Sequence, residues 1–183
     1  RIPMGSCDFS DGHYTYAPTQ SNDLYDFSVD VDKDDIIPMT LAAMEASGGN
    51  LKVMSSPWSP PPWMKKNADM SDGNWGYSGG EFDITYGDVY AQYFVKYVQA
   101  YEEQGIPIWS FTPQNESRFS AFWAWETTLM EPDIQARFIN DHLGPALEAA
   151  GYGDILLWGY DHNKATSDDN GVPWLTRYAD AIY

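Results

Sequence analysis

A glutamate next to an asparagine, Glu116 after Asn115, is the pair of side chains in this sequence best suited to acid and base chemistry. The pair follows the apolar segment 106–112, whose composition favours a β-strand, so the carboxyl stands at the strand's C-terminal end. In a parallel α/β barrel the active site is built at that edge. A carboxylic acid there can protonate a leaving oxygen, as hydrolysis of a glycosidic bond requires.

Such an acid must hold its proton near neutral pH, and burial among apolar groups favours the protonated form. Four aromatic residues follow Glu116 closely enough to supply those surroundings: Phe119, Phe122, Trp123 and Trp125. A single loop glutamate is more often a solvated surface charge. The position after a strand, beside Asn115, leaves both interpretations open on the residues alone.

The composition predicts one domain, residues 1–183, with a single core. Lys and Arg number 10 against 27 Asp and Glu, which gives a formal net charge of −17. This charge repels phosphate backbones and anionic lipids, so nucleic acid and membrane surfaces are unfavourable partners. Aromatic residues make up 16% of the chain, enough to support a packed core or a groove that stacks sugar rings.

Cys7 is the single cysteine, which excludes an internal disulfide and a cysteine-based zinc site, and it is expected to be a small buried residue. His13 and His142 stand in unrelated contexts, so no metal site is expected. No apolar run is long enough to span a membrane, and no signal peptide is recognised. Both ends resemble strands cut through, which predicts a piece of a longer chain.

Strands and helices are expected to alternate along the chain. Strands are expected at the N-terminus and over 51–55, 106–112, 154–160 and 180–183, and helices over 34–47, 88–104, 132–150 with an interruption at 144–145, and 172–179. The strongest helix has one apolar face, formed by Tyr90, Tyr93, Phe94, Tyr97, Val98 and Tyr101, and Gly105 ends it.

This alternation predicts parallel βαβ units. Long loops follow the strands and short connections precede them, which favours a TIM-type (β/α)8 barrel over a doubly wound sheet. A complete barrel needs about 250 residues and eight strands, so the sequence supplies roughly half of one.

Three segments, 1–10, 55–65 and 111–116, closely resemble glycoside hydrolase family 30, and most of all its glucosylceramidase-like branch. The likeness covers nearly the whole chain in collinear order. It implies a (β/α)8 barrel, present here as roughly strands 2 to 6, and a retaining double displacement that needs no cofactor.

The resemblance also implies roles for individual residues. Glu116 would be the acid/base, and Asn115 would bond the sugar 2-hydroxyl. Arg1 would orient the active-site carboxylates, Asp8 would accept bonds from sugar hydroxyls, and Trp58 would line the sugar pocket. The alternatives are a surface ion pair for Arg1 and Asp8 and a packed loop aromatic for Trp58.

Two departures from the family pattern matter. Ser117 stands where proline usually follows the acid/base, so the glutamate backbone is expected to be less restrained. No residue corresponds to the nucleophile, a role that we do not give to Glu126 or Glu131, so these 183 residues alone are expected to be inactive. Asp161, His162 and Asn163 are expected on the same face as Glu116, where they would hold a neighbouring loop or touch substrate.

The expected substrates are β-glucosides, either glucosylceramide-type glycolipids or, as an alternative, β-1,6-linked glucan cleaved by an endo-glucanase. A different class of function is a non-catalytic carbohydrate-binding barrel whose tryptophans stack sugars: Trp58, Trp63, Trp123 and Trp125. From family habit alone, the expected location is extracellular or lysosome-like.

Overall fold

The structure is a computed structural model that describes residues 1–71, 80–119, 125–164 and 166–183. Its centre is one parallel sheet with the spatial order β1-β2-β3-β4, the same as the order in the chain. The strands are β1 (Ile2–Pro3), β2 (Val53–Ser56), β3 (Ile108–Phe111) and β4 (Leu156–Leu157). A sheet in which each strand lies beside the next one in the chain is typical of a barrel segment.

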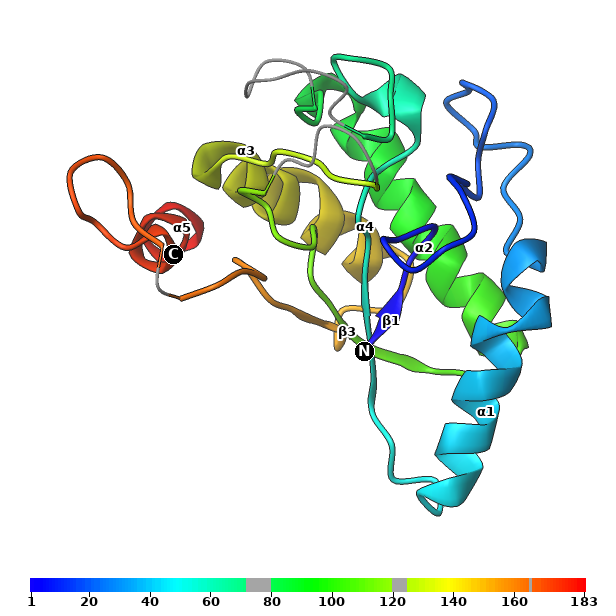
Figure 1. The fold of residues 1–183 in the computed structure, drawn as a ribbon. Coiled ribbons are helices and arrows are strands. Elements are labelled where there is room, and N and C mark those ends of the chain that lie inside the picture. Colours follow the sequence, from blue (N-terminus) through cyan, green and yellow to red (C-terminus); the bar gives the residue numbers. More distant parts are fainter. Residues whose placement is uncertain (72–79, 120–124, 165) are drawn as a thin grey trace.

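The helices lie along one side of this sheet in chain order, from α1 at one end to α5 at the other (Figure 1). They are α1 (Ile36–Ala46), α2 (Gly87–Glu103), α3 (Pro132–Arg137), the π-helical η4 (Phe138–Leu143), α4 (Gly144–Ala149) and α5 (Trp174–Ile182). Three short 3₁₀ turns precede or follow them, at η1 (Asp30–Asp34), η2 (Pro62–Met64) and η3 (Ile84–Tyr86).

The core lies between the sheet and α2. Every residue of the predicted apolar face of that helix is buried. Phe111 of β3 packs edge-on against Phe94, and the Ser55 hydroxyl of β2 bonds the Tyr97 hydroxyl at 3.0 Å. Full burial of each such aromatic side chain stabilises the fold by about 1.5–3 kcal/mol relative to exposure, so α2 anchors the sheet.

Local signals set the helix ends as expected. The Asp35 carboxylate accepts a bond from the Ile36 amide and so caps α1. Gly105 ends α2 with a φ of +81°, a left-handed conformation that glycine adopts without a steric penalty. Cys7 is buried, in agreement with its expected place as a small core residue.

The prediction of a fifth strand at 180–183 is wrong, because α5 continues to Ile182. Leu175, Tyr178 and Ile182 recur at helical spacing, and the buried Tyr178 hydroxyl donates to the Met130 carbonyl at 2.5 Å. The described residues therefore supply four consecutive strands of the barrel instead of the predicted five.

Two other expected elements differ in extent. The strand predicted over 154–160 is reduced to Leu156–Leu157, because β4 bonds only β3 and forms the edge of the described sheet. The predicted interruption at 144–145 is absent. The wider π turn of η4 precedes Gly144, and Pro145 then occupies the first turn of α4, where its missing amide hydrogen is not needed.

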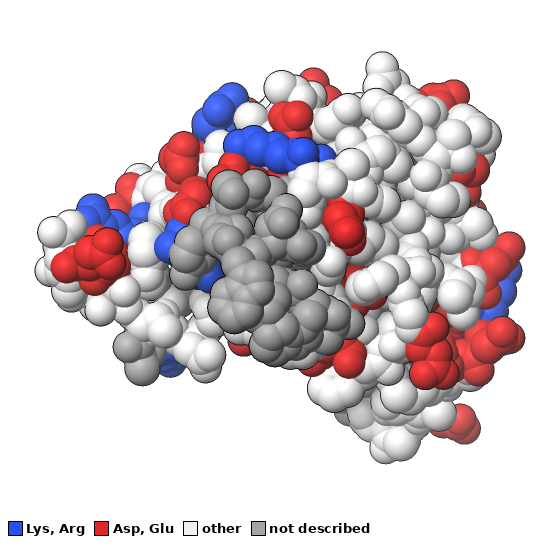
Figure 2. Space-filling view, turned by 45° about the horizontal axis from the view of Figure 1, so that its top comes forward, with Lys and Arg blue, Asp and Glu red and all other residues white. Residues whose placement is uncertain are grey.

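Acidic side chains outnumber basic ones over the face that Figure 2 shows, as the net charge of −17 requires. None of the helices formed by described residues is long and apolar enough to cross a lipid bilayer.

Candidate active site

The segments that follow β2, β3 and β4 meet at the carboxyl end of the sheet. The Asn115 amide donates to the Pro57 carbonyl at 2.8 Å, and the Glu116 amide donates to the Asp161 carbonyl at 2.7 Å. Asn115 also pairs with Asp161 in a parallel bridge beyond the ends of β3 and β4. These bonds extend the sheet by one step and hold the side chains of three loops in one place.

Arg1 joins two of these segments with both ends of its guanidinium. Nη1 donates to Asp161 Oδ2 at 2.5 Å and Nη2 to Asn115 Oδ1 at 2.6 Å, while Cζ lies 4.8 Å from the Trp58 ring centroid. The planar fork of arginine suits two simultaneous acceptors and an aromatic face. Of the predicted site residues, Arg1 therefore contacts two others, Trp58 and Asn115.

Asp161 is the common partner of this network. Its Oδ2 also accepts from the Thr112 hydroxyl at 2.9 Å and, at a longer 3.4 Å, from the Ser56 hydroxyl. Ser56 is the last residue of β2 and Thr112 directly follows β3, which places their hydroxyls at this edge. Arg1 forms its ion pair with Asp161 and not with Asp8.

Glu116 presents its carboxyl at the same edge, with its side chain 39% exposed. Its backbone has a φ of +46°, in the left-handed region that is rare for residues other than glycine. Oε1 lies 3.6 Å from Nδ1 of His162, whose side chain is nearly buried. The carboxyl is therefore open to a ligand on one side and faces an imidazole on the other.

Two predicted residues lie apart from this contact network. Asp8 is exposed in the turn after β1 and has no hydrogen bond or ion pair with any other described residue. Trp125 is half-buried and stacks on Phe119, with ring centroids 6.0 Å apart. Of the aromatic surroundings expected for Glu116, Phe122 and Trp123 lie outside the described residues.

The two glutamates that were not given the nucleophile role are engaged elsewhere. Glu126 is buried and its Oε1 lies 2.8 Å from Nδ1 of His13. Glu131 pairs with Arg118. Among the described residues, no cluster of three or more His, Cys, Asp or Glu side chains is arranged to hold a metal ion.

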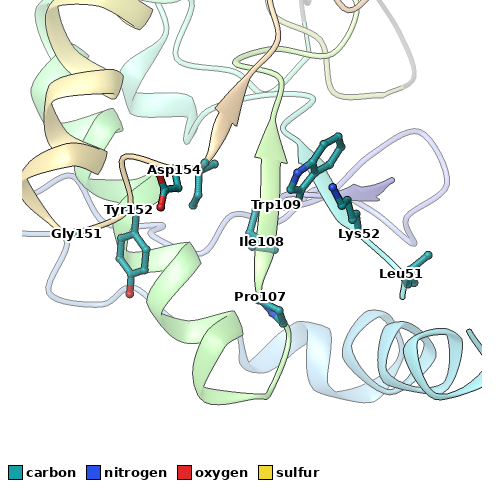
Figure 3. Close-up of a pocket in the computed structure, with 9 residues that line it drawn as sticks. Leu51, Lys52, Pro107, Ile108, Trp109, Gly151, Tyr152 and Asp154 are labelled. Carbon is teal, nitrogen blue, oxygen red and sulfur yellow. The ribbon is translucent and has the colours of Figure 1, made fainter. Parts of the chain in front are cut away.

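A separate groove of about 380 Å³ lies at the opposite end of the strands (Figure 3). Leu51 and Lys52 precede β2, Pro107 precedes β3, and Asp154 precedes β4, so the groove faces the amino ends of the sheet. Lys52 Nζ lies 4.7 Å from the Trp109 ring centroid within it. It includes none of the predicted site residues and a single carboxylate, so we place the candidate site at the carboxyl end.

The network around Asp161 was only partly foreseen. The place of Asp161 and His162 after the fourth strand of the sheet predicted that they share a face with Glu116. It did not predict a hydrogen-bond partner for either residue. The signal that was overlooked is the pair of hydroxyl residues, Ser56 and Thr112, at the ends of adjacent strands. Hydroxyls at that edge are suited to holding a carboxylate.

Comparison with known proteins shows the family and the fold of the chain. The model of the glycosyl hydrolase family 30 TIM-barrel domain matches residues 1–181. Putative glucosylceramidase 4 of Caenorhabditis elegans is 41% identical over 154 residues, which cover 82% of this chain and 29% of that protein. Endo-1,6-beta-D-glucanase neg1 of Aspergillus fumigatus is 39% identical over 177 residues, 89% of this chain and 35% of that protein.

The solved structure of the endo-beta1,6-glucanase BT3312 superposes with a TM-score of 0.80 at 31% sequence identity, covering 99% of this chain and 39% of that one. The parallel order of strands and helices, the domain match and this superposition confirm the predicted fold class, part of a TIM barrel. The chain spans about a third of the length of these curated relatives.

Proposed function

Since this chain belongs to glycosyl hydrolase family 30, we propose that it is part of a retaining β-glycoside hydrolase in which Glu116 is the acid/base. The observation that carries the proposal is the partly exposed Glu116 carboxyl at the carboxyl end of β3, next to Asn115 and its partner Arg1. An accessible carboxyl in the loop after a barrel strand can give its proton to a substrate bound at that edge of the sheet.

In the first step Glu116 protonates the departing glycosidic oxygen while a second carboxylate attacks the sugar. In the second step Glu116 removes a proton from the water that releases the glycosyl-enzyme. No residue of this sequence is assigned as the second carboxylate, so we expect these 183 residues to need the rest of the protein for turnover. No cofactor takes part.

Asn115 and Arg1 act together in this proposal. The Arg1 bond to Asn115 Oδ1 leaves the amide nitrogen of Asn115 to donate to a sugar 2-hydroxyl. Arg1 also keeps the Asp161 carboxylate fixed at the floor of the site. Trp58, beneath the guanidinium, lines the pocket for the sugar ring.

Asp8 and Trp125 complete the proposed sugar site from two further loops. Asp8 is exposed and available to accept bonds from sugar hydroxyls. Trp125 presents a half-buried ring, backed by Phe119, on which a sugar face can stack.

We propose β-glucosides as the substrate class, with two candidates. A glucosylceramide-type glycolipid fits the likeness to the nematode protein named as a glucosylceramidase. A β-1,6-linked glucan fits the likeness to the fungal and BT3312 endo-1,6-glucanases equally well. Turnover of glucosylceramide in detergent micelles against release of gentio-oligosaccharides from β-1,6-glucan separates the two. We propose an extracellular or lysosome-like location on family membership alone.

The decisive experiment uses the full-length protein with Glu116→Ala, assayed on an aryl β-glucoside with and without azide. We expect slow turnover that azide restores, with β-glucosyl azide as the product, because azide needs no general base to attack the glycosyl-enzyme. Glu45→Ala, an exposed change on α1, is the matched control and should retain full activity.

A Glu116→Ala variant as active as the wild type would overturn the assignment. The non-catalytic alternative makes a different prediction for Glu116→Gln. A carbohydrate-binding barrel shows no turnover in either form, whereas the enzyme loses turnover and keeps its affinity for the ligand.

A further inference from the structure

A buried glutamine on α3, Gln135, connects the two segments that carry the acid/base and its neighbouring histidine. Its side chain is fully buried. Nε2 donates to the Ser117 hydroxyl at 2.8 Å, and Oε1 accepts from the Tyr160 amide at 3.0 Å. One amide therefore holds the residue after Glu116 and the residue before Asp161.

Both segments contain a non-glycine residue in the left-handed region at this point. Glu116 has a φ of +46° and Tyr160 a φ of +53°. Such conformations are sterically costly and persist only where the surrounding structure holds them. Tyr160 is one of the two residues that Gln135 bonds, and Glu116 directly precedes the other, Ser117, so a change in either backbone would disturb a hydrogen bond of Gln135.

Further bonds make this connection rigid. The Ser117 carbonyl accepts from the Met130 amide at 3.0 Å, and the Glu116 amide donates to the Asp161 carbonyl at 2.7 Å. Ser117 is buried, and its hydroxyl is the group that Gln135 reaches. The residue that was expected to leave the glutamate backbone less restrained is thus tied to the core through its side chain.

We propose that Gln135 is a positioning residue, which holds the left-handed backbone at Glu116 and Tyr160 so that the Glu116 carboxyl meets the leaving oxygen beside His162. It acts through Ser117 and Tyr160 and touches no substrate atom. This inference rests on the proposed role of Glu116 as the acid/base.

The test exploits the dependence of acid catalysis on the leaving group. A basic phenolate or alkoxide leaves only with a proton from the acid, whereas 2,4-dinitrophenolate leaves almost without help. Misplacing the Glu116 carboxyl therefore lowers kcat/KM for phenyl β-glucoside and spares 2,4-dinitrophenyl β-glucoside. A general loss of folded enzyme lowers both values equally.

The variants are made in the full-length protein. Gln135→Met keeps the side-chain length and removes both hydrogen bonds, and Ser117→Ala removes only one of them. Thr40→Val on α1 is the matched control, because Thr40 is also buried and bonded, in its case to the Ile36 carbonyl of its own helix. Thermal melting of each variant reports how much stability each change removes.

We expect Gln135→Met to lower kcat/KM for phenyl β-glucoside by roughly tenfold and for the dinitrophenyl substrate by less than about twofold. The tenfold loss is smaller than the full contribution of a general acid, because the carboxyl is displaced and not removed. Ser117→Ala should also lower kcat/KM more for phenyl β-glucoside than for the dinitrophenyl substrate, but by a smaller factor. Thr40→Val should change neither value. Equal effects on both substrates, or no effect, in the folded Gln135→Met protein would overturn the inference. If that variant does not fold, Ser117→Ala decides by the same criterion.

Glu116→Ala is measured on the same two substrates. If it shows no preference for the activated leaving group, the proposed function itself fails. If it shows that preference and neither Gln135→Met nor Ser117→Ala does, only the positioning role of Gln135 fails.

Discussion

Nδ1 of His162 lies 3.6 Å from Oε1 of Glu116, just beyond hydrogen-bonding distance. The histidine side chain is 9% exposed, and Nδ1 is buried without a hydrogen-bond partner among the described residues. A buried nitrogen that faces only one carboxyl is well placed to form a hydrogen bond when substrate binding brings the two side chains closer. The two residues come from different loops, joined by the backbone bond from Glu116 to Asp161.

Replacing that imidazole by a ring of similar shape tests its importance. We expect His162→Phe to lower kcat/KM by about tenfold, because the Glu116 carboxyl loses the ring nitrogen that faces it. His142→Phe is the control, since His142 pairs with Asp88 on the outer helices. Equal kcat/KM values for wild type and His162→Phe would show that the imidazole has no part in the reaction.

The Arg1 fork should not tolerate a conservative change. Arg1→Lys replaces two directed bonds, to Asp161 and Asn115, by one mobile ammonium, so we expect kcat/KM to fall by about 10- to 100-fold with little change in melting temperature. Arg177→Lys is the matched control, because Arg177 of α5 also donates two hydrogen bonds, both to Oδ2 of Asp168. The idea fails if the two lysine variants have the same kcat/KM.

A buried carboxyl outside the hydrogen-bond network of the site should influence stability. Asp32 accepts hydrogen bonds from the hydroxyls of Tyr14, Tyr16 and Tyr101. Burial raises the pKa of Asp32 above its ordinary value, and the three hydrogen bonds only partly oppose this. The folded state therefore retains this proton when the unfolded chain has lost it. The Asp32 contribution to the free energy of unfolding then falls as the pH rises from about 4 through the raised pKa.

Asp32→Asn removes this titration and leaves a polar side chain of the same size. We expect the variant to be less stable by about 1–3 kcal/mol at low pH, with a smaller fall in stability as the pH rises. Urea unfolding at several pH values measures both quantities. Asp34→Asn, at an exposed neighbouring position, is the control. Parallel curves for wild type and Asp32→Asn would contradict the argument.

A phenylalanine of η4 packs at the contact between η4 and α2. Phe138 is fully buried and its ring contacts those of Phe82, Tyr90 and Phe94. Phe138→Ala leaves a cavity and should cost about 3–5 kcal/mol of unfolding free energy. Phe9→Ala, at a side chain 88% exposed, should change stability by less than about 0.5 kcal/mol. Similar unfolding free energies for the two variants would show that the aromatic cluster does not stabilise the domain.

Much of the architecture could be predicted because its signals are local. The i, i+3, i+4 spacing of aromatic residues defines the buried face of α2, and Asp35 and Gly105 mark helix ends through their own capping and backbone preferences. Alternation of strands with helices then gives a parallel sheet. The prediction is wrong where tertiary packing outweighs the local preference of the residues for a strand. At 180–183 the packing of α5 against α3 extends the helix instead.

At the π turn of η4, too, the surrounding backbone and not the residue types alone decides whether the helix continues. Gly144 and Pro145 indicate a break in the helix when they are read alone. A wider preceding turn lets the helical stretch run on through both residues. The hydrogen bonds that form such a turn depend on the local path of the backbone, which residue type does not specify.

By itself, the sequence determined which side chains belong at the carboxyl end of the sheet, since Asn115, Glu116 and Asp161 each follow a strand. Only the tertiary structure decided how they connect. Arg1 reaches Asp161 across 160 positions of the chain, and Gln135 of α3 joins Ser117 to Tyr160. Strand and helix signals arise from neighbours in the chain, whereas these hydrogen bonds require the register of neighbouring strands and the packing of α3 behind them.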